Sequence, residues 1–171
     1  MKIQDLLLFN QALNSVLHLS GAKFAYAVSR NLAILKPEME SLEKASTPSE
    51  AYLKFDEERI KLVEKYAEKD EKGKPKQVPM AINPRQTEYV IEQDKQNELD
   101  TEFGKLKEEH KEAIEARETQ VKEYNELLKT DAPKLEFHKI TIADVPNNIN
   151  GSQLHGIREF MVEDAVLTPY K

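Results

Sequence analysis

The stretch KYAEKDEKGKPKQV at 65–78 holds the densest group of residues that could bind a ligand. A calcium loop of the EF-hand type needs oxygen ligands at alternate positions, a glycine at the sixth position and a glutamate at the twelfth. Here Asp70 and Glu71 are adjacent, and Gly73 follows Asp70 by only three residues. A P-loop ends in Gly-Lys-Ser/Thr, whereas a proline follows Gly73 and Lys74. We therefore interpret this stretch as a helix end and a turn into a strand.

The histidines and paired carboxylates, which could supply acid–base or metal chemistry, do not form a local site. The four histidines are His18, His110, His138 and His155. No two of them are three or four residues apart, so no helix face carries a pair of imidazole ligands. Glutamate pairs such as Glu108-Glu109 are typical of a solvated helix face, since acid–base pairs need a dry pocket that separates their pKa values. We therefore predict a non-enzymatic protein without catalytic residues, cofactor or metal. A metal enzyme assembled from distant histidines and carboxylates is an alternative, ranked third after the two functions given at the end of this section.

Charge and cysteine content exclude several classes of function. The 171 residues carry a net charge of −6, and the sequence pI is near 5.4. Binding to a nucleic-acid backbone or to anionic lipid needs a positive footprint, so we expect neither direct nucleic-acid binding nor membrane binding. The absence of cysteine excludes disulfides, thiolate zinc sites and thiol catalysis. The apolar run LLLF at 6–9 is too short to span a membrane and lacks the basic flank of a signal peptide.

The fold class predicted from composition and pattern is mainly α with a small β component (α+β). A hydrophobic fraction of 39% and a charged fraction of 33% favour elongated antiparallel helices with large solvated faces. We expect a single helix-rich domain over 1–171, with one β-hairpin and one further strand. The first two helices are predicted over 3–18 and 22–44, and Pro37 predicts a kinked or restarted second helix. The heptad-like seam of the second helix consists of Ala25, Val28, Leu32, Leu35, Met39 and Leu42.

Capping and alternation signals predict the next two elements. In STPSE, Thr47 would be the N-cap of a third helix, and Glu50 would complete a capping box. This helix is predicted to end near Lys69. An alternating run of Val78, Met80 and Ile82 follows, and after an Asn-Pro turn the apolar residues Tyr89, Val90 and Ile91 could form a second short strand. They predict a β-hairpin over 76–91.

The longest predicted element is a charged helix over 94–129 with Asp94 as its N-cap. Its length would be roughly 54 Å at 1.5 Å per residue. That is longer than a domain of this size is usually wide, so part of the helix should project or pair with another chain. The candidate interaction face is formed by Leu99, Phe103, Leu106, Val121, Tyr124 and Leu128. The candidate acidic face is formed by Glu108, Glu109, Glu112, Glu115 and Glu118.

The C-terminal part is predicted to hold one strand and one short helix. KLEFHKITI at 134–142 has the β-branched and aromatic content of a strand. Asn150 and Gln153 form a capping pair for a last helix over 151–163. We expect the tail after Glu163 to fray.

Several segments occur in a recognisable order along the chain. They are KFAYAVSRNLAIL at 23–35, EERIKLVEKYAEKDEKGKP at 57–75, EYVI in the predicted hairpin, and FHKITIADVP, SQLHGI and FMVED near the end. In this order the chain resembles a group of small uncharacterised proteins encoded by tailed bacteriophages and prophages, a domain-of-unknown-function family. The resemblance implies a phage protein that acts in the host bacterial cytoplasm or in the virion. It implies no catalytic residue.

Two functions from different classes follow from these features. The leading hypothesis is a non-enzymatic phage protein that acts through protein–protein contacts, with a protein partner or as a homo-oligomer, for example in virion or tail assembly. The alternative is an acidic inhibitor of a host nucleic-acid enzyme or defence factor, because an acidic helix face can imitate the regularly spaced charge of a phosphate backbone.

Overall fold

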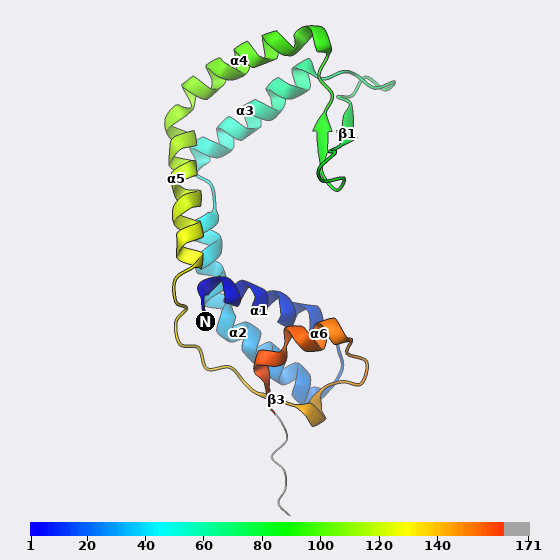
Figure 1. Ribbon diagram of the computed structural model, residues 1–171, viewed down its shortest axis with the longest axis vertical. Coiled ribbons are helices and arrows are strands. Elements are labelled where there is room, and N and C mark those ends of the chain that lie inside the picture. The colour runs from blue at the N-terminus through cyan, green and yellow to red at the C-terminus, as the bar shows by residue number, and fades with distance from the viewer. Residues whose placement is uncertain (163–171) are drawn as a thin grey trace, which may run out of the picture. The chain divides into compact units, whose positions relative to one another are not determined.

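The computed structural model of the chain describes residues 1–162 (Figure 1). Within this range six α-helices, several 3-10 turns and two two-stranded sheets confirm the predicted mainly α fold with a small β component. Contacts group the described chain into two compact units. The first unit comprises Met1–Ser46 with residues 122–162, and the second unit comprises Thr47–Val121. The single domain over 1–171 stays a prediction.

The first unit begins with α1 (Ile3–Val16) and α2 (Ala22–Ser46), which pack against each other. Both confirm the predicted helices to within two residues. Gly21 between them has a φ of +134°, a conformation that glycine adopts readily and other residues rarely do. α2 continues through Pro37, where the Ser41 hydroxyl donates to the Pro37 carbonyl at 2.8 Å. The kink at this proline stays a prediction.

The core of the first unit is apolar and aromatic. Its fully buried side chains include Leu6, Leu13, Val16, Phe24, Val28, Leu35, Ile140, Ile157 and Phe160. Phe9, Phe137 and Phe160 meet edge to face, with ring centroids 6.0, 5.1 and 5.0 Å apart. Such pairs stabilise a core by about 0.5–1.5 kcal/mol beyond their burial. The core therefore joins the N-terminal helices to the C-terminal segment.

The predicted strand over 134–142 is wrong except near its end. Within that range only β3 (Ile140–Thr141) forms a ladder, parallel to β4 (Met161–Val162). Upstream the backbone bonds to a helix side chain. The Asn31 amide oxygen accepts the His138 N–H at 2.7 Å, and the Asn31 amide nitrogen donates to the His138 carbonyl at 2.9 Å. Because this side chain satisfies the backbone, the β-forming composition of the segment does not extend the ladder.

A short helix near the C-terminus confirms one capping prediction. After the 3-10 turn η2 (Ile142–Asp144), α6 (Gly151–Gly156) begins at the predicted capping box. The Asn150 side chain accepts the Gln153 N–H at 2.9 Å, and the Gln153 side chain accepts the Asn150 N–H at 3.1 Å. These bonds satisfy N–H groups that lack partners within the helix.

The predicted helix over 151–163 is wrong beyond Gly156. The 3-10 turn η3 (Arg158–Phe160) and then β4 follow instead. A Cβ at Gly156 would lie 3.1 Å from the Ala12 Cβ, so glycine lets α6 approach α1 closely, and glycine is also a poor helix former. The predicted fraying after Glu163 lies outside the described residues.

In the second unit, α3 (Glu50–Tyr66) begins at a different cap from the predicted one. Ser49 is the N-cap, and its hydroxyl accepts the Tyr52 N–H at 3.2 Å. The predicted Thr47 cap is therefore wrong. Both residue types cap well, and the choice between them depends on which residue the backbone places directly before the first turn.

α3 ends at Tyr66 and not near the predicted Lys69 because the following residues pair with the hairpin. The Glu68 N–H donates to the Val90 carbonyl at 2.7 Å, and the Lys76 N–H donates to the Glu68 carbonyl at 2.8 Å. These bonds to distant segments replace the helical bonds that the local sequence would allow.

The predicted hairpin over 76–91 is confirmed. Its strands β1 (Gln77–Pro79) and β2 (Thr87–Tyr89) pair antiparallel (Figure 1). The Tyr89 hydroxyl donates to the Glu64 carboxylate at 2.8 Å, and this bond raises the pKa of Tyr89. The bond ties the hairpin to α3.

The turn between α3 and the hairpin uses its carboxylate to bind its own backbone. The Asp70 Oδ1 accepts the N–H groups of Lys72 and Lys74, both at 2.8 Å. Gly73 has a φ of +73°, the left-handed region that a tight turn requires. The interpretation of this stretch as a helix end and a turn into a strand is confirmed.

The predicted helix over 94–129 is divided in two. η1 (Gln93–Lys95) leads into α4 (Gln96–Glu109), and α5 (Lys111–Leu128) follows a break at His110. The predicted N-cap Asp94 is therefore wrong, because it lies inside η1. The His110 backbone has φ −104° and ψ 16°, outside the helical region.

Candidate interaction surfaces

The break at His110 is tied to α3 by its side chain. The His110 Nε2 lies 2.8 Å from a carboxylate oxygen of Glu58, and the His110 ring lies against Phe55 at a centroid distance of 5.6 Å. The side chain of His110 is only 10% exposed. The hydrogen bond with His110 lowers the pKa of Glu58. This histidine therefore holds the helix break against α3, as a packing and hydrogen-bonding residue.

The predicted interaction face is divided between internal packing and the surface. Its six members are Leu99, Phe103 and Leu106 in α4, and Val121, Tyr124 and Leu128 in α5. Leu99 is buried, and Phe103 and Leu106 are half-buried in the helix that packs on α3. Val121 is exposed, and Tyr124 and Leu128 are half-buried. The α4 members therefore serve the fold, and the α5 members retain accessible apolar surface.

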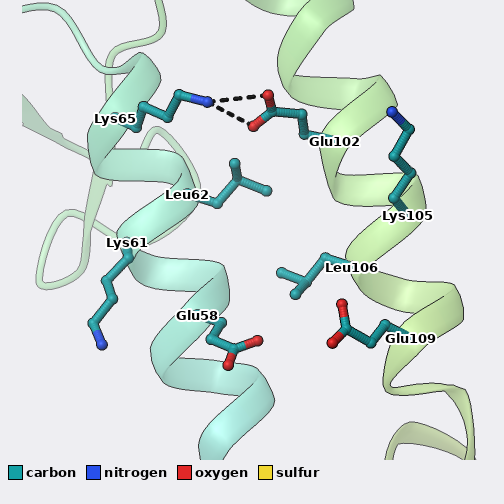
Figure 2. A pocket seen from close by; sticks show the side chains of 8 residues that line it. All are labelled: Glu58, Lys61, Leu62, Lys65, Glu102, Lys105, Leu106 and Glu109. Carbon is teal, nitrogen blue, oxygen red and sulfur yellow. Dashed lines mark hydrogen bonds and ion pairs between the residues drawn. The ribbon is translucent and has the colours of Figure 1, made fainter.

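One groove between α3 and α4, which we call the charged groove, combines two leucines with ionic side chains (Figure 2). It is lined by Glu58, Lys61, Leu62, Lys65, Glu102, Lys105, Leu106 and Glu109. Figure 2 shows Leu62 and Leu106 pointing toward each other across the helix pair. The Lys65 ammonium bonds both Glu102 carboxylate oxygens, at 3.0 and 2.8 Å. This bond lowers the pKa of Glu102 and raises that of Lys65.

The charges of this groove balance. The lining holds three carboxylates and three ammonium groups, so it offers no net charge to a ligand. The Lys65–Glu102 pair is also well exposed to water, with side-chain exposures of 58% and 41%, and exposed pairs contribute little to stability. We interpret the charged groove as the solvated margin of the α3–α4 contact.

A second groove, which we call the aromatic groove, lies along α3, α4 and α5 and has a volume of about 630 Å³. It is lined by Tyr52, Phe55, Asp56, Arg59, Phe103, Lys107, Ile114, Arg117, Glu118 and Val121. The Tyr52 and Phe55 rings are 5.7 Å apart at their centroids. The Lys107 ammonium lies 4.4 Å from the centroid of Phe103, which is within cation–π range.

The sequence contained part of the signal for this groove. Phe103 and Val121 belong to the predicted interaction face, and the apolar residues of α3 follow a helical period. The aromatic contribution of Tyr52 and Phe55 to the same groove was missed, because it depends on how α3 pairs with α4 and α5. The Gln120 amide nitrogen also donates to the Thr47 carbonyl at 2.9 Å, which holds the start of the second unit to α5.

The predicted acidic face is exposed at each of its members, Glu108, Glu109, Glu112, Glu115 and Glu118. The first three line a shared surface hollow around the helix break. Glu118 lies at the aromatic groove instead. Lys111 approaches Glu108 at 4.0 Å.

Within residues 1–162, no group of three or more histidines, cysteines, aspartates or glutamates is placed to hold a metal ion. In the same residues no helix has the length and apolar character needed to cross a membrane.

Comparisons of the chain with protein-family models, curated proteins and solved structures found no match. The resemblance to proteins of tailed bacteriophages and prophages therefore stays a prediction.

Proposed function

We propose that this protein is non-enzymatic and acts through protein–protein contacts made by the second unit and α5. The observation that carries the proposal is the lack of buried residues in α5. This helix has 18 residues, and none of them is buried. Its apolar stripe nevertheless includes Ile114, Val121, Tyr124 and Leu128, all half-buried or exposed.

The physical reason is that helices of this kind gain most of their stability from packing. An isolated helix shorter than about 12–15 residues is marginal in water, and longer helices in proteins still depend on an apolar face that is covered. Full burial of a valine or leucine side chain stabilises by about 1.5–3 kcal/mol. A partner that covers the α5 stripe would supply part of that free energy on binding.

The resemblance to phage-encoded proteins extends the proposal to a place of action. The contacts would serve virion or tail assembly, and the protein would act in the host bacterial cytoplasm or in the virion. Co-purification from infected cells, followed by identification of the captured proteins, tests this part. Capture of virion or assembly proteins would support it, and capture of host metabolic enzymes alone would refute it.

The contact proposal is tested with two matched variants of the full chain. Val121 and Leu53 are exposed apolar residues of the second unit, 41% and 46% accessible, and only Val121 lines the aromatic groove. Val121→Asp should abolish partner capture and any concentration-dependent association in light scattering, whereas Leu53→Asp should change neither. A wild-type protein that stays monomeric and captures no partner refutes the proposal.

The acidic inhibitor is the second candidate, and the exposure of all five glutamates of the acidic face favours it. Replacing all five by glutamine should abolish binding to a basic nucleic-acid enzyme. The wild-type binding should also weaken steeply as salt rises, because both surfaces are charged and exposed. Equal binding by the neutral variant would exclude this candidate.

A further inference from the structure

The start of α6 contains the single Asn-Gly sequence of the chain, Asn150-Gly151. In such a sequence the backbone nitrogen of the glycine can attack the side-chain amide carbon of the asparagine, because glycine has no side chain to obstruct the approach. Both residues are exposed, and Asn150 lines a surface hollow between α1 and α6. A Cβ built at Gly151 would meet nothing within 4 Å. Neither burial nor crowding therefore protects this pair from reaction.

The backbone conformation of Asn150 is nevertheless unreactive. Its ψ of 165° places the Gly151 nitrogen opposite the Asn150 nitrogen about the Cα–C bond, and staggered relative to Cβ. Closure of a five-membered ring needs the Gly151 nitrogen to eclipse Cβ, so the Cα–C bond must rotate. Both bonds of the capping box, in which Asn150 and Gln153 exchange N–H and side-chain contacts, join groups on opposite sides of that bond. Rotation into the reactive conformation therefore breaks the cap.

The cap is held in turn by the packing of α6 on α1 (Figure 1). The Gln153 side-chain amide nitrogen donates to the Ser15 carbonyl of α1 at 2.8 Å. Gly156 approaches Ala12 of α1 closely, and Ile157, the next residue, is fully buried. The conformation of Asn150 thus depends on tertiary contacts of the first unit.

We infer that Asn150 is a site of spontaneous deamidation that reacts only when the cap of α6 opens. In the open state the Gly151 nitrogen loses its proton to solvent and attacks the Asn150 Cγ. The bond from Cγ to Nδ2 then breaks, and ammonia leaves with a proton from solvent. Water opens the resulting cyclic imide, so one water is consumed and one ammonia is released overall. This inference concerns the first unit and does not depend on the proposed contacts.

The two products of ring opening affect α6 differently. Aspartate caps a helix about as well as asparagine, and its charge is favourable at a helix N-terminus. In isoaspartate the main chain continues through the former side chain and is longer by one methylene, so the capping oxygen no longer lies opposite the Gln153 N–H. Ile157 and Phe160, which follow in the chain, are fully buried in the core. The isoaspartate product should therefore loosen the C-terminal segment of the first unit.

The test measures deamidation of the full chain at neutral pH, both folded and unfolded in urea. Trypsin releases residues 140–158, and fragmentation of this peptide in a mass spectrometer separates reaction at Asn150 from reaction at Asn147 or Asn148. We expect Asn150 to react faster in the unfolded chain. Gln153→Ala removes half of the capping box and the bond to α1. It should speed the folded reaction by about fivefold, the factor by which loss of a cap shifts an equilibrium, and leave the rate in urea unchanged.

Two further variants serve as controls. Ser152→Ala changes an exposed residue of the same turn and should leave the folded rate unchanged. Gly151→Ala places a methyl group beside the attacking nitrogen, where the fold leaves open space, and should slow the reaction in both states. An undiminished rate for Gly151→Ala in urea would overturn the proposed chemistry.

Other results would overturn the control by the cap. An unfolded chain that does not deamidate at Asn150 would show that the site is unreactive. A folded chain that reacts as fast as the unfolded chain, or Gln153→Ala reacting at the wild-type rate, would show that the cap does not protect it.

The effect of the two products is measured by urea unfolding. Asn150→Asp should unfold at the same urea concentration as the wild type, and an aged sample enriched in isoaspartate at this position should unfold at a lower one. The amide N–H of Gln153 should also exchange faster in the aged sample. Equal unfolding of all three proteins would overturn the expected loosening.

Discussion

Replacing Asn31 tests how the first unit holds its C-terminal segment. Asn31 lies in α2 and is completely buried. Its side chain accepts the His138 N–H at 2.7 Å and donates to the His138 carbonyl at 2.9 Å, across 107 residues of sequence. The Asn31 side chain thus makes the two backbone hydrogen bonds that a neighbouring β-strand would otherwise make. Asn31→Ala removes both bonds and leaves a small cavity.

The magnitude follows from the two lost bonds. A typical intramolecular hydrogen bond contributes about 1 kcal/mol net, and an unsatisfied buried group costs about 1–3 kcal/mol. The His138 backbone groups are part-buried, so water compensates for some of this loss. We expect Asn31→Ala to lower the free energy of unfolding by about 2–4 kcal/mol.

Urea unfolding followed by circular dichroism measures this change, and hydrogen exchange locates it. Asn31→Leu keeps most of the side-chain volume but not the bonds, so its loss should remain close to that of alanine. Asn14→Ala is the control, because the exposed Asn14 amide bonds only within α1, to the Asn10 carbonyl. The exchange of the His138 amide should accelerate in both Asn31 variants. A loss of stability below about 1 kcal/mol in both Asn31 variants, with unchanged exchange of the His138 amide, would refute the role of Asn31 in holding the His138 backbone.

The remaining predictions concern pH, close packing and the hairpin. The bond to His110, part-buried at the helix break, lowers the pKa of Glu58, so the contribution of Glu58 to stability is present above the ordinary carboxyl pKa and is lost as pH falls through the lower folded value. Glu58→Gln should therefore reduce the acid-induced loss of stability below about pH 4.5, measured by unfolding at several pH values, whereas the exposed Glu57→Gln should not. Gly156→Ala should destabilise the protein by about 1–3 kcal/mol, because the new Cβ would lie only 3.1 Å from the Cβ of Ala12 in α1. Gly151→Ala, which has open space around it, should not destabilise the protein. Ile82→Ser should change the free energy of unfolding by less than about 0.5 kcal/mol, since Ile82 is 95% exposed; a larger loss in thermal or urea unfolding would place Ile82 in a packed contact.

Local sequence signals correctly predicted the elements whose formation depends on residues close together in the sequence. The Asn150–Gln153 capping box depends on residues three apart, and the hairpin over 76–91 depends on alternation around an Asn-Pro turn. The first two helices follow from apolar periodicity. Each of these predictions was confirmed because no distant segment competes with the local preference.

The errors occurred where distant segments compete. α3 ends early because Glu68 bonds to the hairpin, and the segment before β3 is irregular because Asn31 takes its backbone bonds. The helix break at His110 coincides with contacts to Glu58 and Phe55, more than fifty residues away in sequence. None of these partners is visible in a local window.

The sequence by itself determined the helical character, the charge balance and the positions of the exposed glutamates, since periodicity and composition act residue by residue. The tertiary structure decided which apolar residues remain accessible. Leu99 and Val121 belong to the same predicted stripe, yet Leu99 is buried and Val121 lines an open groove with Tyr52 and Phe55. The physical reason is that α3 covers only part of the stripe, and how far one helix covers another is set by packing between distant segments.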